Sequence, residues 1–101
     1  MKKSKKAVWT DFFKTEEVSS ESQDWQGKIL VLHPDRVAPA YRQPRFLLWK
    51  ATGGFGCNPT AAGRAVFTIA LADGERVRWD RADFAGVFTG KLPEGCHSLG
   101  S

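Results

Sequence analysis

The chain has 101 residues, of which 42% are hydrophobic and 12% aromatic, and its formal net charge is +4. A length near 100 residues favours a single domain, and this apolar content excludes an intrinsically disordered chain. No apolar run approaches the roughly 18–20 residues needed to cross a bilayer, and the N-terminus lacks the apolar stretch of a signal peptide. We therefore expect a cytoplasmic protein with no membrane partner.

The charge is arranged in blocks along the chain. Residues 1–6 contain four lysines, whereas residues 7–27 carry one lysine against five carboxylates. Residues 28–91 contain ten Lys or Arg against five Asp or Glu, which gives this segment a charge of +5. A basic domain favours polyanionic partners, either nucleic acid or an acidic protein surface.

Residues 1–24 are expected to form a basic tail, a short amphipathic segment and an acidic linker. Within AVWTDFF, the spacing of Val8, Trp9, Phe12 and Phe13 fits one face of a short helix. This helix would dock either on its own domain or on a partner, since three exposed aromatic rings would form a costly apolar patch.

Residues 25–90 have the pattern of a small β domain. The apolar run GKILVLH ends at Pro34, which favours a buried strand. Pro39 and Pro44 then predict a loop or an irregular edge, because proline cannot donate to a strand ladder. The expected strands cover residues 27–33, 45–52, 64–72, 75–81 and 85–89. Residues 91–101 are expected to be a disordered tail.

The clearest local signal is a hairpin that turns at Asp73-Gly74, because this dipeptide supplies the backbone angles of a tight turn. Before the turn, alternation predicts one inward face with these members: Ala65, Phe67, Ile69 and Leu71. After the turn, Val77 and Trp79 are predicted to point inward, and Arg76 and Arg78 outward.

The ending LADGERVRWDRADFAGVF resembles the last third of Tudor-type and related SH3-like barrels, over residues 64–89. Together with the five expected strands, this resemblance implies a mainly β fold: a small five-stranded antiparallel SH3-like barrel with one helical turn before the last strand. The short N-terminal helix is expected from the spacing in AVWTDFF. With Trp79 predicted inward, no clear aromatic cage can be assembled, so methyl-lysine recognition is not implied. Folds of this shape carry unrelated activities, and the resemblance does not give a function.

The glycine-rich segment 53–63 is the first candidate site, since glycines let backbone N–H groups approach an anion. Three interpretations are open: a wide connection between strands, a ligand or partner loop, and a phosphate cradle. The segment does not match the phosphate-binding pattern G-x-x-x-x-G-K-[ST]. With its flanking cations, this candidate site contains the following residues: Lys50, Gly53, Gly54, Phe55, Gly56, Cys57, Asn58 and Arg64.

A second interpretation makes Cys57 a nucleophile, for which His33 or His97 would have to act as the base. No acid or amide is placed to orient either histidine, and a free thiol or a disulfide with Cys96 are the alternatives. The chain offers no close-spaced ligand set beyond Cys96-His97. We therefore expect no metal and no cofactor.

The arginines form the third candidate site. Arg76 and Arg78, joined by Arg64 from the preceding strand, would make an outward basic face suited to phosphate or carboxylate. The alternative is neutralisation by acidic neighbours, namely Asp73, Glu75, Asp80 and Asp83. Four aromatic residues are expected in the core, namely Trp49, Phe67, Trp79 and Phe84. Trp25 and Tyr41 are the expected exposed rings.

Together these observations predict a small non-catalytic binding module, monomeric or weakly self-associating, that contacts nucleic acid or another polyanion through a basic face and a glycine-rich loop. The alternative is a protein-interaction or regulatory factor, for example of a mobile element, that acts through AVWTDFF and the glycine-rich loop. A Cys57-dependent enzyme is the third hypothesis.

Overall fold

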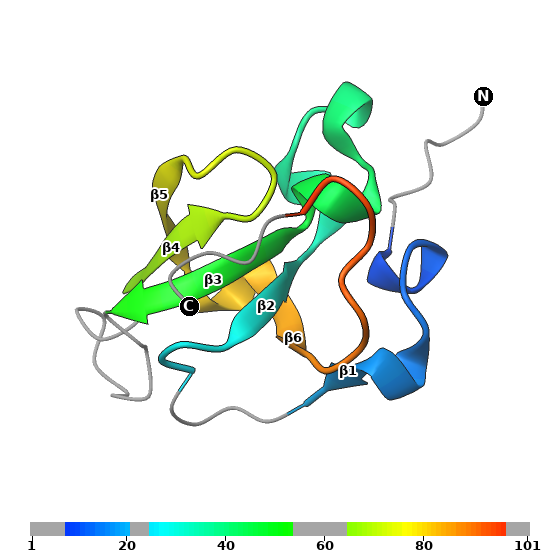
Figure 1. Cartoon of the computed structure of the whole chain (residues 1–101), viewed down its shortest axis with the longest axis horizontal. Helices are drawn as coiled ribbons and strands as arrows, with labels where there is room; N and C mark the ends of the chain where they lie inside the picture. The colour runs from blue at the N-terminus through cyan, green and yellow to red at the C-terminus, as the bar shows by residue number, and fades with distance from the viewer. Residues whose placement is uncertain (1–7, 21–24, 54–64, 97–101) are drawn as a thin grey trace.

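The computed structural model describes residues 8–20, 25–53 and 65–96 of the chain. Its main element is a curved six-stranded antiparallel sheet with the order β1-β6-β2-β3-β4-β5 (Figure 1). The strands are β1 (Val18–Ser19), β2 (Ile29–Leu32), β3 (Leu48–Gly53), β4 (Ala65–Ala70), β5 (Arg76–Asp80) and β6 (Phe84–Phe88). The predicted mainly β class is therefore confirmed.

Three finer expectations about this fold differ from the structure. The sheet has six strands instead of five, because Val18–Ser19 in the predicted linker pairs with β6. The described helical segments are all 3-10 turns, and the predicted N-terminal helix is the three-residue turn Trp9–Asp11. In the described residues no ladder joins β1 to β5, so the sheet is open where a closed barrel was expected.

The helical turn expected before the last strand is present as a 3-10 turn at Arg81–Asp83. Asp80 begins this turn, and its carboxylate accepts a 2.8 Å hydrogen bond from the backbone N–H of Ala82. In return, the N–H of Asp80 donates to the carboxylate of Asp83 at 2.9 Å. This reciprocal capping holds the chain as it passes from β5 to β6.

Strand β2 is buried on both faces, which explains its continuous apolar sequence. Leu30 and Leu32 belong to one core cluster, which includes Trp49 and Val66. Val31 points to the other face and belongs to a second cluster with Leu48, Leu71 and Phe88. The sheet thus separates two apolar layers.

The second layer is covered by the N-terminal segment. Phe13 is 6% exposed and packs edge-on against Phe88, with ring centroids 5.3 Å apart. Trp9 and Phe12 are partly buried against the same cluster. From the other end of the chain, Leu92 also packs there. The aromatic side chains of AVWTDFF are therefore used to cover the protein's own sheet.

Three 3-10 turns connect β2 to β3, and each begins at a proline: Pro34–Arg36, Pro39–Tyr41 and Pro44–Phe46. Proline fits the first position of such a turn, because its fixed φ is already near the required value and its missing N–H is not needed there. The last turn is tied to β3 by Trp49, whose Nε1–H donates to the carbonyl of Phe46 at 3.2 Å.

A hairpin is present at the predicted place, but its loop is wider than the predicted two-residue turn, because the N–H of Ala70 donates to the carbonyl of Glu75 and residues 71–74 lie between them. Gly74 has a φ of +80°, and its N–H donates to the carbonyl of Ala70 at 2.8 Å. On β5, Val77 and Trp79 pack against the first core cluster, and Arg76 and Arg78 are exposed, as predicted.

The predicted inward face was wrong within β4, although Leu71, just after the strand, is buried as predicted. Val66, Thr68 and Ala70 are buried, whereas Phe67 is 47% exposed. Thr68 is accommodated in the interior because its hydroxyl donates to the carbonyl of Val77 at 2.8 Å. The predicted core position of Phe67 is therefore replaced by a surface position.

The two rings expected on the surface have different positions. Tyr41 is 54% exposed, as expected. Trp25 is only 4% exposed, which contradicts the prediction. It packs edge-on against Phe84, with centroids 6.0 Å apart, and the Arg81 guanidinium lies 4.4 Å above its ring. The buried indole thus completes the first core cluster.

Candidate functional site

The outward face of β3, β4 and β5 brings basic and apolar side chains together. Phe67 lies directly opposite Arg78, and Ile69 lies opposite Arg76 on one side and Lys50 on the other. Residues that face each other across an antiparallel ladder share one face of the sheet. We call this surface the sheet face and define it by these residues: Lys50, Thr52, Phe67, Ile69, Arg76 and Arg78.

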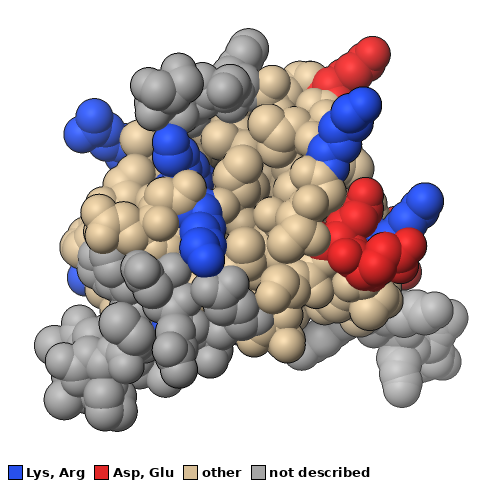
Figure 2. Space-filling model, turned by 60° about the horizontal axis from the view of Figure 1, so that its bottom comes forward, with Lys and Arg blue, Asp and Glu red and all other residues tan. Residues whose placement is uncertain are grey.

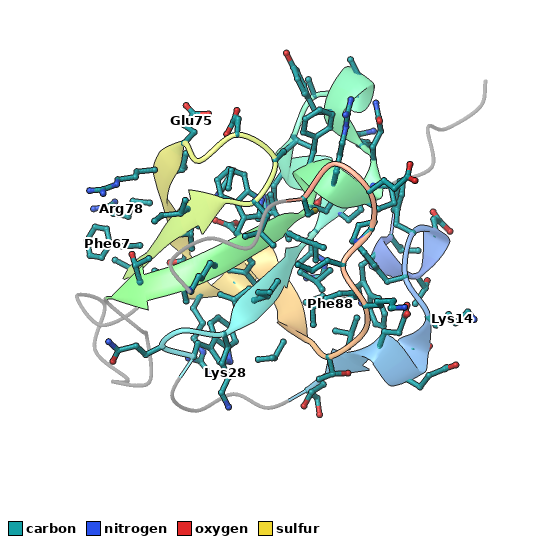
Figure 3. The ribbon with its side chains drawn as sticks, viewed as in Figure 1. Lys14, Lys28, Phe67, Glu75, Arg78 and Phe88 are labelled. Carbon is teal, nitrogen blue, oxygen red and sulfur yellow. The ribbon has the colours of Figure 1, made fainter. Side chains whose placement is uncertain are left out.

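The sheet face contains an open depression of about 370 Å³, whose lining includes Thr52, Phe67 and both arginines. Phe67 and Arg78 lie side by side and project away from the core (Figure 3). The neighbouring Thr52 is anchored, because its hydroxyl donates to the carbonyl of Phe67 at 3.1 Å. A half-exposed aromatic ring is thus presented beside a guanidinium.

Two of the acidic side chains that could neutralise the arginines of the sheet face, Asp73 and Asp83, have contacts elsewhere. Asp73 accepts a 2.9 Å hydrogen bond from the N–H of Glu75. Asp83 caps the turn before β6 and forms a 3.0 Å ion pair with Arg36. Within the residues that the structure describes, neither Arg76 nor Arg78 is in an ion pair. These two charges are therefore available to an anionic partner.

Figure 2 shows the distribution of charge over one face of the molecule. In this view the acidic side chains lie toward the right, whereas the basic ones are more dispersed and several lie at the left and near the middle. The acidic and basic groups are thus unevenly distributed, and part of the surface is free of carboxylates.

The predicted site residues divide into two groups. Lys50, Arg76 and Arg78 are brought together on the sheet face, and Gly53 ends β3 opposite Phe67. The remaining predicted residues lie outside the described part of the chain: Gly54, Phe55, Gly56, Cys57, Asn58 and Arg64. The glycine-rich loop stays a prediction.

Two members of the sheet face, Phe67 and Ile69, were not predicted to be on the surface. The signal that identifies them is the parity of the hairpin register. In the observed pairs, Thr68 lies opposite Val77 and Val66 lies opposite Trp79. The inward positions are therefore even-numbered on β4 and odd-numbered on β5. A two-residue turn at Asp73-Gly74 gives the same parity, so inward Val77 and Trp79 require an outward Phe67.

The described cysteine shows no sign of activation. Burial raises the pKa of the Cys96 thiol, an effect that nearby Arg45 partly opposes. The thiol contacts the carbonyl of Arg45 at 3.8 Å. Cys57, the proposed nucleophile, and His97, one of its two candidate bases, lie outside the described residues, whereas His33, the other candidate base, lies within them. A thiol with a raised pKa is a poor nucleophile at neutral pH.

Metal sites and membrane-spanning helices are both absent from the described ranges. Residues 8–20, 25–53 and 65–96 contain no group of three or more His, Cys, Asp or Glu side chains that could hold a metal ion. The same ranges contain no helix long and apolar enough to span a membrane.

Comparison of the chain with models of protein families, with curated proteins and with solved structures gave no match. The resemblance to SH3-like barrels accordingly stays a prediction. A proposal about function has to rest on the chemistry of the sheet face.

Proposed function

We propose that this protein is a binding module for single-stranded nucleic acid and that the sheet face is its contact surface. The observation that carries the proposal is the direct register of half-exposed Phe67 with exposed Arg78. An aromatic ring offers a platform for a base, and a guanidinium beside it offers a fork for a phosphate. Arg76 and Lys50 extend the positive charge across neighbouring strands.

A single strand suits this surface better than a duplex. The ring of Phe67 can stack only on a base whose face is free, and the bases of a duplex are already stacked on each other. The depression along the strands is open, so an extended chain can pass over it. The lysines of residues 1–6 would add attraction to phosphates without regard to sequence.

The alternative function, protein interaction through AVWTDFF, is less well supported. Phe13 is buried, and Trp9 and Phe12 pack against the second core cluster. A partner that used these rings would have to detach them from the sheet first. The sheet face needs no such rearrangement.

Titration of the full chain with labelled oligonucleotides tests the proposal. We expect binding to single-stranded DNA or RNA at about 50 mM salt, weaker binding at about 200 mM salt, and a preference over duplexes of equal length. The absence of binding at the lower salt concentration would refute the nucleic-acid function. A preference for duplexes would refute the stacking role of Phe67.

A further inference from the structure

A second open cavity, of about 390 Å³, lies between the proline-rich connection and the β4–β5 turn. One wall is aromatic and consists of Tyr41, Phe46 and Trp49. The opposite rim is formed by the β4–β5 turn and carries Asp73 and Glu75. This cavity is separate from the sheet face, because none of its lining residues lines the depression at Phe67.

The charge of this cavity is opposite to that of the sheet face. Among the described residues that line it, both charged members are acidic, and none is Lys or Arg. Three arginines of the proline-rich connection are sequence neighbours of lining residues, but each makes another contact. Arg36 pairs with Asp83, and Arg45 lies over the ring of Phe46. The Nε of Arg42 donates to the carbonyls of Pro34 and Val37, at 3.0 and 3.3 Å. The cavity is therefore an acidic site on a basic protein.

The aromatic wall is accessible mainly at Tyr41. Its ring meets that of Phe46 edge-on, with centroids 5.3 Å apart and an interplanar angle of 79°. The Arg45 guanidinium already lies 4.6 Å from the centroid of Phe46. Trp49 is 7% exposed and is held by its hydrogen bond to Phe46, so only a small part of its ring lines the cavity. An incoming group would meet Tyr41 and the carboxylates.

We propose that this cavity holds an arginine side chain of a partner polypeptide. A guanidinium is planar and weakly hydrated, so it can lie on the Tyr41 ring while its N–H groups reach the carboxylates of Asp73 and Glu75. Its three methylene groups would contact the apolar part of the wall, including Val37 and Ala38. An ammonium group is a strongly hydrated point charge and fits this combination less well.

The proposal is tested by titrating the full chain with capped Gly-Ser peptides that contain one central residue, either arginine, lysine or citrulline. The Trp49 indole N–H resonance reports on the cavity, and the Trp25 resonance, from an indole outside it, serves as an internal reference. We expect the arginine peptide to shift Trp49 selectively and to bind about fivefold or more tightly than the neutral citrulline peptide. Equal binding of arginine and citrulline, or of arginine and lysine, would overturn the proposal, as would the absence of any shift.

Three variants complete the test. Tyr41→Ala and Glu75→Gln should each weaken arginine binding about two- to fivefold, and both residues are exposed, so folding is preserved. Glu16→Gln removes the same charge from an exposed position outside the cavity and should leave binding unchanged. Equal effects of Glu75→Gln and Glu16→Gln would show a general charge effect and contradict the site. Trp49 shifts that depend on protein concentration without peptide would assign the cavity to a second copy of this chain and refute a separate partner.

Discussion

Phe67 and Arg78 face each other across the β4–β5 ladder, and both are exposed on the outer side of the sheet. The register that places them there also turns Val66 and Trp79 toward the first core cluster. One hairpin thus fixes both the interior and the proposed contact surface. The predictions below separate these two roles.

We expect Arg78→Gln to weaken the binding of single-stranded oligonucleotides and to lower their salt dependence. Loss of one phosphate contact reduces the slope of log K against log salt by about 0.7 for a single strand. Lys14→Gln is the matched control, because Lys14 is exposed and lies on the opposite side of the molecule from Arg78 (Figure 3). Equal slopes for the two variants would contradict a phosphate contact at Arg78.

Replacement of two neighbouring residues on β4 should lower stability by unequal amounts. Val66 is fully buried, so Val66→Ala should lower the free energy of unfolding by about 2 kcal/mol. Phe67 is half-exposed, so Phe67→Ala should cost about 1 kcal/mol or less. Urea denaturation measures both values. A larger loss for Phe67→Ala than for Val66→Ala would show that the register of β4 is shifted by one residue.

Gly86 is expected to be required for the docking of β1. A Cβ at this position would overlap the backbone carbonyl of Ser19 and crowd the side chain of Val18. We predict that Gly86→Ala lowers the free energy of unfolding by about 1–3 kcal/mol. Amide hydrogen exchange should also become faster at Ser19 and Thr89, where the N-terminal segment meets the end of β6.

The control for this variant is Gly53→Ala. Among the described residues, a Cβ at Gly53 would meet only the ring of Phe67, at an ordinary contact distance of 4.0 Å. It should change stability much less than Gly86→Ala. Comparable losses for both variants would argue against a specific contact between β1 and Gly86.

Cys96 is expected to react slowly with thiol reagents. Burial raises its pKa, so at pH 8 a smaller fraction is thiolate than in an unstructured peptide, and the thiolate is the reactive form. Labelling is measured in Cys57→Ser, where Cys96 is the single thiol of the chain. The rate should be below that of a short cysteine peptide in buffer and should equal it in urea. Equal rates in buffer would contradict the burial of this thiol.

Much of the fold could be predicted from local patterns. The Asp73-Gly74 turn, the inward side of β5 and the helical turn before the last strand follow from turn chemistry and alternation. The two-residue strand β1 could not be predicted this way. Val18 and Ser19 have no strand pattern of their own, and they pair with β6 across nearly seventy intervening residues.

The site was predicted less completely than the fold. Its arginines were found because charged residues on an alternating strand point outward. Phe67 was assigned to the core on its hydrophobicity, although the parity of the hairpin register places it with the arginines. Trp25 was assigned to the surface because nothing local indicates that Phe84, distant in sequence, covers it. Burial of an aromatic ring depends on tertiary packing, and the residues next to it in the sequence do not predict that packing.

The most direct test of the central claim is the affinity of Phe67→Ala for a short single-stranded oligonucleotide, measured beside Phe67→Tyr and the wild type at one salt concentration. If Phe67 stacks on a base, Phe67→Ala should bind about 10- to 100-fold more weakly, and Phe67→Tyr should retain nearly all of the affinity. Wild-type affinity in Phe67→Ala, with the fold intact, would contradict the proposal that the sheet face binds single-stranded nucleic acid through Phe67.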